Sequence, residues 1–138
     1  MTEPDAPAAA FVDTDVLVRH LAGDHPVQSP RATAYLAQAE TLVLTDVVVA
    51  ELVYVLESVY RAPRERIRAA VRSLLAFGPI VVRDAELLLR AVEAYEDHRI
   101  DFAEAYLVAS AERSGVGVIA SFDGSLDRAT TIRRVEPA

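Results

Sequence analysis

The chain contains no cysteine, no lysine and no apolar run long and charge-free enough to cross a bilayer. The lack of cysteine excludes disulfides, thiolate metal sites and a cysteine nucleophile, and it fits a reducing cytoplasm. The lack of lysine excludes a P-loop lysine, a Schiff-base lysine and the lysine partner of a phosphorylated aspartate. Without a transmembrane candidate, we expect a cytoplasmic protein that is not attached to a membrane.

All 14 basic residues are arginines, and the net charge is −7. An acidic protein binds nucleic acid poorly unless a metal ion or a local basic patch offsets the repulsion. A length of 138 residues fits one domain with a real core. Residues 1–9 carry acids and prolines and lack the basic start of a secretory signal, so we expect a flexible lead-in there and a single domain over 10–138.

Short apolar runs alternate with longer, helix-like segments along the chain. The pattern predicts an α/β fold in which helices cover both faces of a parallel sheet. The expected strands are 10–13, 41–45, 79–84, 116–123 and 131–137, and the expected helices are 14–23, 29–40, 45–60, 62–78, 84–100 and 101–115. The strand over 116–123 should be buried, and the helix over 45–60, apolar on all sides, should be central.

Two of these helices carry more specific expectations. Ser29 is a candidate N-cap with Pro30 at the first helical position. In the helix over 62–78, four arginines share one face: Arg64, Arg66, Arg68 and Arg72. A solvated face is the commoner explanation, and contact with RNA phosphates is the alternative.

Acidic residues lie where the expected strands end and the expected helices begin. Asp13 follows the first strand and can be an N-cap or a ligand, and Asp15 suits the positive end of the helix dipole. Glu51 has apolar neighbours three and four positions away on its helix, so we expect it to be desolvated. A desolvated glutamate needs an arginine, a hydrogen-bond network or a metal as partner.

The other acids also have local explanations. Asp101 and Glu104 match a capping box, and Asp123 precedes Gly124 as in an Asp-Gly turn. Asp127 can cap or turn the chain as well. A metal site does not exclude these roles, because positions three apart share one face of a helical turn.

Five acids can meet at one rim, since strand ends in a parallel α/β sheet lie along the same edge. These acids are Asp13, Glu51, Asp101, Glu104 and Asp123. Their repulsion calls for a proton or a divalent cation, and oxygen ligands without histidine or cysteine select Mg²⁺ or Mn²⁺ over zinc. A metal ion bound by carboxylates indicates an enzyme that acts on phosphate esters. The hydroxyls of Thr14 and Ser121 could orient a ligand or a water molecule there.

Four segments, in this order and spacing, resemble the PIN-domain ribonucleases and, within them, the VapC toxins of type II toxin-antitoxin modules. The segments are "FVDTDVLVRHL", "VVVAELVYVLESVY", "DFAEAYLVASAERSG" and "VIASFDGSLDR". The resemblance covers the chain after the lead-in. It implies a three-layer α/β/α sandwich with a central parallel sheet, and a Mg²⁺- or Mn²⁺-dependent endoribonuclease. The implied metal ligands are the five acids, of which Asp13, Glu51, Glu104 and Asp123 are the implied catalytic residues.

The chain departs from the family at two positions. The family usually has aspartate where this chain has Glu104, and commonly asparagine where it has Asp15. Similarity to VapC toxins also implies a homodimer that forms a heterotetramer or larger assembly with a VapB-type antitoxin. Such an antitoxin would place a helix in a groove and insert an arginine into the acidic pocket.

Two other functions remain open from the sequence. A receiver-like signalling domain also has acids at strand ends, but the missing lysine counts against it. A PIN-like binding module with a weak site would act through protein contacts, and the two departures motivate that alternative.

Overall fold

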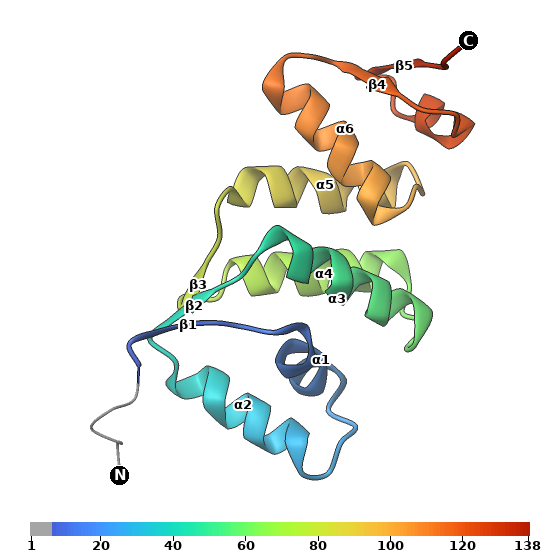
Figure 1. The fold of residues 1–138 in the computed structure, drawn as a ribbon. Helices are drawn as coiled ribbons and strands as arrows, with labels where there is room; N and C mark the ends of the chain where they lie inside the picture. The colour runs from blue at the N-terminus through green and yellow to red at the C-terminus, as the bar shows by residue number, and fades with distance from the viewer. Residues whose placement is uncertain (1–6) are drawn as a thin grey trace. The chain divides into compact units, whose positions relative to one another are not determined.

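The computed structural model describes residues 7–138 of the chain. Strands and helices alternate along it, which confirms the expected α/β fold (Figure 1). The helices are α1 (Thr14–Ala22), α2 (Gln28–Gln38), α3 (Asp46–Ser58), α4 (Arg64–Leu75), α5 (Ala85–Asp97) and α6 (Phe102–Ser114). The strands are β1 (Ala9–Phe11), β2 (Thr41–Val43), β3 (Ile80–Val81), β4 (Val118–Ala120) and β5 (Arg133–Val135), and a 3-10 helix, η1 (Gly124–Arg128), precedes β5.

The chain forms two compact units. The first comprises Met1–Arg61 and Ser73–Arg83, and the second comprises Ala62–Arg72 and Asp84–Ala138. Each unit has its own parallel sheet and its own buried side chains. Most of the predicted lead-in lies outside the described residues, and its last residue, Ala9, already belongs to β1. No helix within residues 7–138 has the length and apolar character that a membrane span requires.

The first unit is built on a sheet with strand order β1-β2-β3. Both pairings are parallel: Phe11 lies opposite Val43, and Leu42 lies opposite Ile80. The central strand is the best covered, and Leu42 is 1% exposed. α1 packs against α2 on this unit, as Figure 1 shows. α1 ends as expected at Gly23, which adopts the left-handed φ of 63° that glycine tolerates.

The start of α2 differs from the prediction. The helix begins at Gln28, and Ser29 is not its N-cap. The N-cap residue is Val27, and the imidazole of His25 satisfies the start of the helix, because its Nδ1 accepts hydrogen bonds from the N–H groups of Val27 (3.2 Å) and Gln28 (2.9 Å). The buried Ser29 hydroxyl accepts a hydrogen bond from the His25 N–H at 3.1 Å. The serine therefore fixes the loop that presents the histidine.

α3 has one buried face and one open face. Thr45 caps it by accepting a hydrogen bond from the Val48 N–H at 3.2 Å, as one of two expected caps. Its buried residues are Val49, Leu52, Val53 and Leu56. The expectation that this helix would be central is met by one face only, since Val47 is 76% and Tyr54 is 68% exposed on the other. Apolar residues occupy both faces, so the pattern could not separate the core from the surface.

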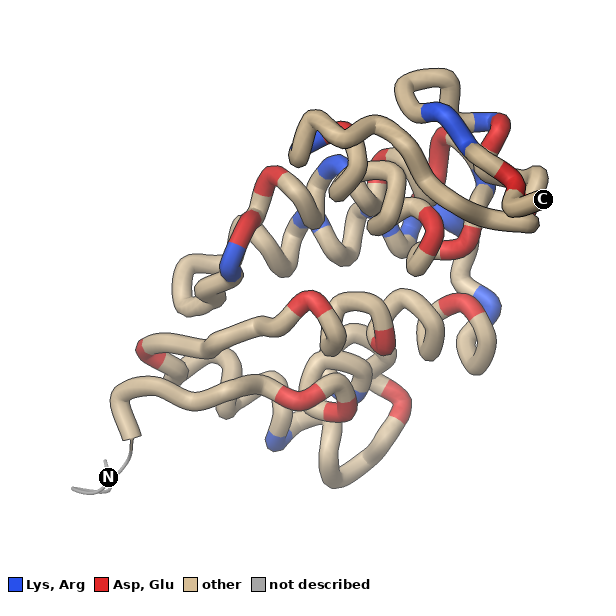
Figure 2. Tube along the Cα trace, turned by 45° about the horizontal axis from the view of Figure 1, so that its top comes forward, with Lys and Arg blue, Asp and Glu red and all other residues tan. Residues whose placement is uncertain are grey.

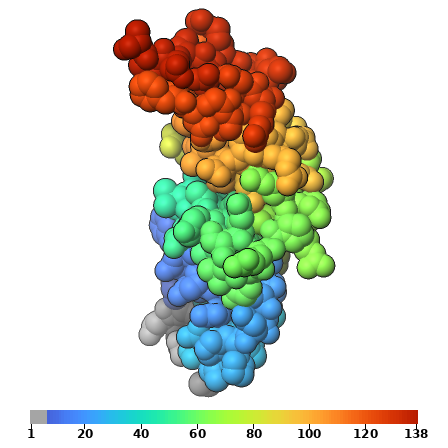
Figure 3. Space-filling model, turned by 90° about the vertical axis from the view of Figure 1, so that its right-hand side faces the viewer, coloured from blue at the N-terminus to red at the C-terminus, as the bar shows by residue number. Residues whose placement is uncertain are grey.

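The second unit combines the parallel pair β4-β5 with α5, α6 and η1. α5 and α6 pack closely. In Figure 3 the orange and red atoms of α6 and the later elements form one continuous surface. Tyr95 and Phe102 meet edge to face in this core, with ring centroids 6.3 Å apart. The expectation that β4 would be buried is correct only for its middle residue. Ile119 is buried, while Val118 and Ala120 are exposed.

Candidate active site

Asp13 and Glu51 are linked through a hydroxyl in the first unit. β1 leads the chain to Asp13, which caps α1 by accepting a hydrogen bond from the Thr14 N–H at 2.7 Å. The hydroxyl of Thr14, which is buried, donates to Oε2 of Glu51 on α3 at 2.9 Å. The N-cap role and a ligand role for Asp13 are compatible, because the cap bond orients the carboxylate without changing its charge.

These two carboxylates line a cavity of about 400 Å³. Other residues on its wall are Asp15, Arg19, Val55 and Tyr60. The prediction that Glu51 would be desolvated was wrong, because Glu51 is exposed along with its helical neighbours Val47 and Tyr54. Its partner is nevertheless of an expected kind, a hydrogen bond from a remote segment. Asp15 adds an exposed carboxylate to the same wall.

Glu104 is held by a serine hydroxyl in the second unit. Its Oε2 accepts a hydrogen bond from Ser125 Oγ at 3.0 Å. Asp101 occupies the N-cap position of α6, but its side chain makes no cap hydrogen bond. The predicted capping box is therefore wrong. Glu104 points to the remote hydroxyl of Ser125 and to Asp123 instead of back to the start of its own helix.

Asp123 lies after β4, beyond Ser121 and Phe122, in a turn that two serines close. Its Oδ1 accepts a hydrogen bond from the Ser125 N–H at 2.9 Å, and its own N–H donates to Ser121 Oγ at 2.9 Å. The expected turn at Asp123 and Gly124 is present as the start of η1. Asp127 lies outside this group, in an ion pair with Arg134 whose two contacts measure 3.0 Å and 3.1 Å.

Glu104 and Asp123 form a coupled pair of carboxyl groups. Burial is the main cause that raises the pKa of Glu104, and the hydrogen bond that it shares with Asp123 raises it further, while the Ser125 hydroxyl lowers it. The same shared hydrogen bond and the contacts with Ser125 lower the pKa of Asp123 to about 2. Two carboxylates can share a hydrogen bond only with a proton between them, which Glu104 therefore carries at low pH.

The five predicted ligands divide into two sets, Asp13 and Glu51 on the first unit and Asp101, Glu104 and Asp123 on the second. Within residues 7–138, neither unit by itself gathers three acidic or histidine side chains in a metal-binding arrangement. The donor chemistry fits a hard cation, because every member is a carboxylate. The Glu104–Asp123 pair also suits a cation. A divalent cation would offset the repulsion between these two carboxylates, as a shared proton does.

Thr14 is a site hydroxyl that the sequence predicts, whereas Ser125 is one that it does not. The sequence places Thr14 beside Asp13, but its hydroxyl bonds Glu51. Ser125 bonds both Glu104 and Asp123. Ser125 could have been predicted from its position two residues after Asp123. At that spacing an aspartate side chain commonly accepts a hydrogen bond from the backbone N–H in a turn.

The arginines of α4 do not form one uniform basic face. Arg64 donates through Nη1 to the carbonyls of Tyr95 and Ile100, both at 2.7 Å, and its guanidinium lies 4.3 Å from the centroid of the Tyr95 ring. Arg68 is neutralised by acids of α5, whereas Arg66 and Arg72 are exposed. The alternative of phosphate contact is thus disfavoured for Arg68 in particular.

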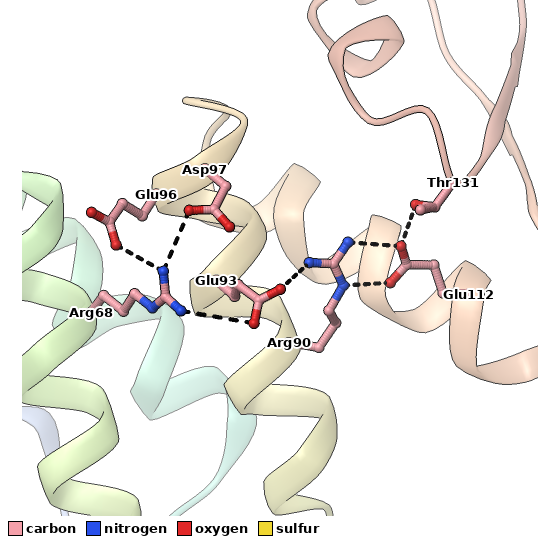
Figure 4. Close-up of polar contacts among 7 residues, drawn as sticks. All are labelled: Arg68, Arg90, Glu93, Glu96, Asp97, Glu112 and Thr131. Carbon is pink, nitrogen blue, oxygen red and sulfur yellow. Dashed lines mark hydrogen bonds and ion pairs between the residues drawn. The ribbon is translucent and has the colours of Figure 1, made fainter.

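Arg68 belongs to an ion-pair network that joins three helices of the second unit (Figure 4). Its closest acid is Glu96 at 2.9 Å, and Glu93 connects it to Arg90, which pairs with Glu112 through contacts of 2.7 Å and 2.9 Å. The network ends at Thr131, whose hydroxyl donates to Glu112. These charges tie α4, α5 and α6 together and are not available to a ligand.

Comparison with known proteins gives one result that covers nearly the whole chain. The model of one protein family, described as "PIN domain", matches residues 10–131. The matched range contains all five carboxylates of the candidate site as well as Thr14 and Ser125. A search of curated proteins found no match to this chain.

Proposed function

Because this chain belongs to the PIN domain family, a family of metal-dependent nucleases, we propose that it is an endoribonuclease that hydrolyses RNA phosphodiester bonds. The observation that carries the proposal is the ordering of carboxylates by remote hydroxyls: Thr14 holds Glu51, and Ser125 holds Glu104. The buried hydroxyl of Thr14 holds the exposed carboxylate of Glu51 in one position. Fixed positions are what a site needs in order to present carboxylates to a cation.

The proposed ligands of Mg²⁺, with Mn²⁺ as a substitute, are Asp13, Glu51, Asp101, Glu104 and Asp123. A bound divalent cation lowers the pKa of a water molecule and offsets the negative charge of the phosphodiester. The residues of the chain provide the frame for that chemistry. Thr14 and Ser125 restrict the rotamers of their glutamates, and the turn after β4 restricts Asp123. Among the proposed ligands, Asp13, Glu51, Glu104 and Asp123 are the proposed catalytic residues.

The test of this proposal is cleavage of single-stranded RNA by the purified chain with Mg²⁺, with Mn²⁺ and with EDTA. We expect cleavage with either cation, none with EDTA, and a loss of at least about 100-fold in kcat/KM for Asp13→Asn and Asp123→Asn. Glu40→Gln removes an exposed carboxylate elsewhere and should cleave like the unaltered chain. Cleavage that survives both EDTA and Asp13→Asn would contradict the metal mechanism.

We further propose that the chain acts as a VapC-type toxin in the cytoplasm, as a homodimer that a VapB-type antitoxin inhibits. The order and spacing of the four acidic segments support this, and the net charge of −7 suits a basic antitoxin segment. Induced expression should arrest growth, and Asp13→Asn should remove that effect. Light scattering should give the mass of a dimer alone and of a heterotetramer or larger complex with the antitoxin, and a monomer in both states would contradict the assembly.

A further inference from the structure

The second unit contains a polar cavity that the carboxylate site does not use. It has a volume of about 490 Å³ and is lined by Arg64, Asp97, His98, Arg99 and Arg128. Its residues come from α4, from the end of η1, from the last position of α5 and from the connection between α5 and α6. That connection continues directly into Asp101 at the N-cap of α6, so the cavity adjoins the second set of carboxylates along the chain.

Two of its arginines are fixed by backbone carbonyls. Arg64 donates to the Ile100 carbonyl at 2.7 Å, and Arg128 donates through Nη1 to the carbonyl of Arg99 at 2.9 Å. Two successive carbonyls are thus held by arginines from two different elements. Arg99 itself has a left-handed φ of 54°, which is uncommon for a residue with a side chain. The guanidinium groups of Arg64 and Arg128 are therefore positioned before any ligand arrives.

The charge of this cavity is not balanced internally. Within residues 7–138, no carboxylate lies at ion-pair distance from Arg64, Arg99 or Arg128, and Asp97 is paired with Arg68 at 3.4 Å. Most of the arginines belong to the second unit, and the arginines are the blue positions of Figure 2. In a chain with a net charge of −7, three arginines around one cavity form a local basic patch.

We infer that Arg99, Arg128 and Arg64 bind a phosphodiester group of single-stranded RNA next to the one that is cut. This inference rests on the proposed ribonuclease function and adds the substrate-binding subsite to it. Guanidinium groups match phosphate oxygens in geometry and charge. Arg64 keeps its second terminal nitrogen for such a contact, because its two carbonyl bonds both use Nη1. Bound phosphate would leave the neighbouring sugar and base free to vary, so the subsite sets the path of the strand and not its sequence.

The experiment measures binding without cleavage. A fluorescein-labelled single-stranded 2′-O-methyl RNA of mixed sequence is titrated in EDTA, by anisotropy, at several KCl concentrations. Arg99→Asn keeps a residue that tolerates the left-handed backbone, and Arg128→Gln keeps a donor for the Arg99 carbonyl. We expect each to weaken binding about tenfold and to lower the slope of log K against log salt by about 0.7.

Arg66→Gln is the matched control, since it removes an exposed arginine of α4 that lies outside the cavity. It should bind the oligonucleotide nearly as well as the unaltered chain. The subsite is overturned if Arg99→Asn and Arg128→Gln bind like Arg66→Gln, or if the unaltered chain does not bind at all. RNA cleavage with Mg²⁺ is scored separately. An active enzyme with unchanged binding in the cavity variants contradicts the subsite alone, whereas weakened binding without any cleavage contradicts the ribonuclease alone.

Discussion

Thr14 and Glu51 are joined by a hydrogen bond of 2.9 Å although 37 positions separate them in the chain. The threonine is 4% exposed, while the glutamate is exposed on α3. The bond therefore connects the buried start of α1 to an acidic side chain at the surface. It fixes the Glu51 carboxylate beside the cavity that Asp13 also lines.

Replacing Thr14 with valine should reduce RNA cleavage without unfolding the protein. Valine has nearly the same shape, so the loss is confined to one hydrogen bond, and the exposed Glu51 can bond water instead. We expect kcat to fall about tenfold and the free energy of unfolding to fall by about 1 kcal/mol. Steady-state kinetics and urea unfolding measure the two effects. Thr14→Ser keeps the hydroxyl and should restore most of the activity, and equal losses in both variants would show that the bond does not matter.

Replacing Glu104 with glutamine should stabilise the protein at neutral pH in EDTA. The pKa of Glu104 is raised in the folded state, so folding favours its protonated form. The stabilisation from this group is fully present below the ordinary glutamate pKa and is lost as pH rises through the pKa in the folded state. Glutamine mimics the protonated form at all pH values, since its amide can donate to Asp123. Urea unfolding should show the gain near pH 7 and none at acid pH.

The double variant Glu104→Gln with Asp123→Asn gives the control for this effect. Without the Asp123 carboxylate, the amide of Gln at position 104 has no charged acceptor, and the gain should shrink. The lowered pKa of Asp123, about 2, acts in the opposite sense: it stabilises the fold at pH values above the ordinary aspartate pKa, and this is lost as pH falls toward 2. A gain from Glu104→Gln that is independent of pH would contradict the assignment.

Mg²⁺ should raise the melting temperature of the chain in the absence of RNA. A cation that binds only the folded state at about 100 times its Kd stabilises that state by about 2.7 kcal/mol. Differential scanning fluorimetry with and without Mg²⁺ measures the shift. Asp13→Asn and Asp123→Asn should each reduce it, whereas Glu40→Gln should not. If calorimetric titration at millimolar Mg²⁺ gave no binding heat, the chain would be better described as a PIN-like binding module.

Breaking the ion pair between Arg90 and Glu112 should cost more than breaking an exposed pair. Both partners are partly buried, and their hydrogen bond lowers the pKa of Glu112. We expect Arg90→Met to reduce the free energy of unfolding by about 1.5–3 kcal/mol, since it leaves the Glu112 carboxylate without its cation. Urea unfolding measures the loss.

Arg113 provides the comparison for that variant. It pairs with Asp84 at 2.7 Å and with Glu86 at 2.9 Å, and its own side chain is 47% accessible, against 28% for Arg90. Arg113→Met should therefore lower the free energy of unfolding by less than Arg90→Met does. The double variant Arg90→Met with Glu112→Gln should recover part of the loss, because no unpaired charge remains. Equal costs for Arg90 and Arg113 would contradict the importance of burial at this network.

The sequence predicted the elements well where the signal was local. The order of strands and helices, the cap at Thr45 and the stops at Gly23 and Gly115 all follow from periodicity and residue type. Predictions failed where two local candidates competed. Ser29 had the composition of a cap, but the loop placed the His25 imidazole at the helix start. Glu104 had the spacing of a capping box, but Ser125 and Asp123 offered partners from a remote turn.

The sequence by itself determined the α/β alternation, the positions of the carboxylates along the chain and the absence of cysteine and lysine chemistry, because each depends on residue type and on spacing within one element. Only the tertiary structure decided which groups meet. It brought Thr14 to Glu51, Ser125 to Glu104, and the arginines of α4 and η1 to the carbonyls of one connection. Hydrogen bonds act over about 3 Å, so their partners are set by packing between distant segments, which no local pattern in the chain encodes.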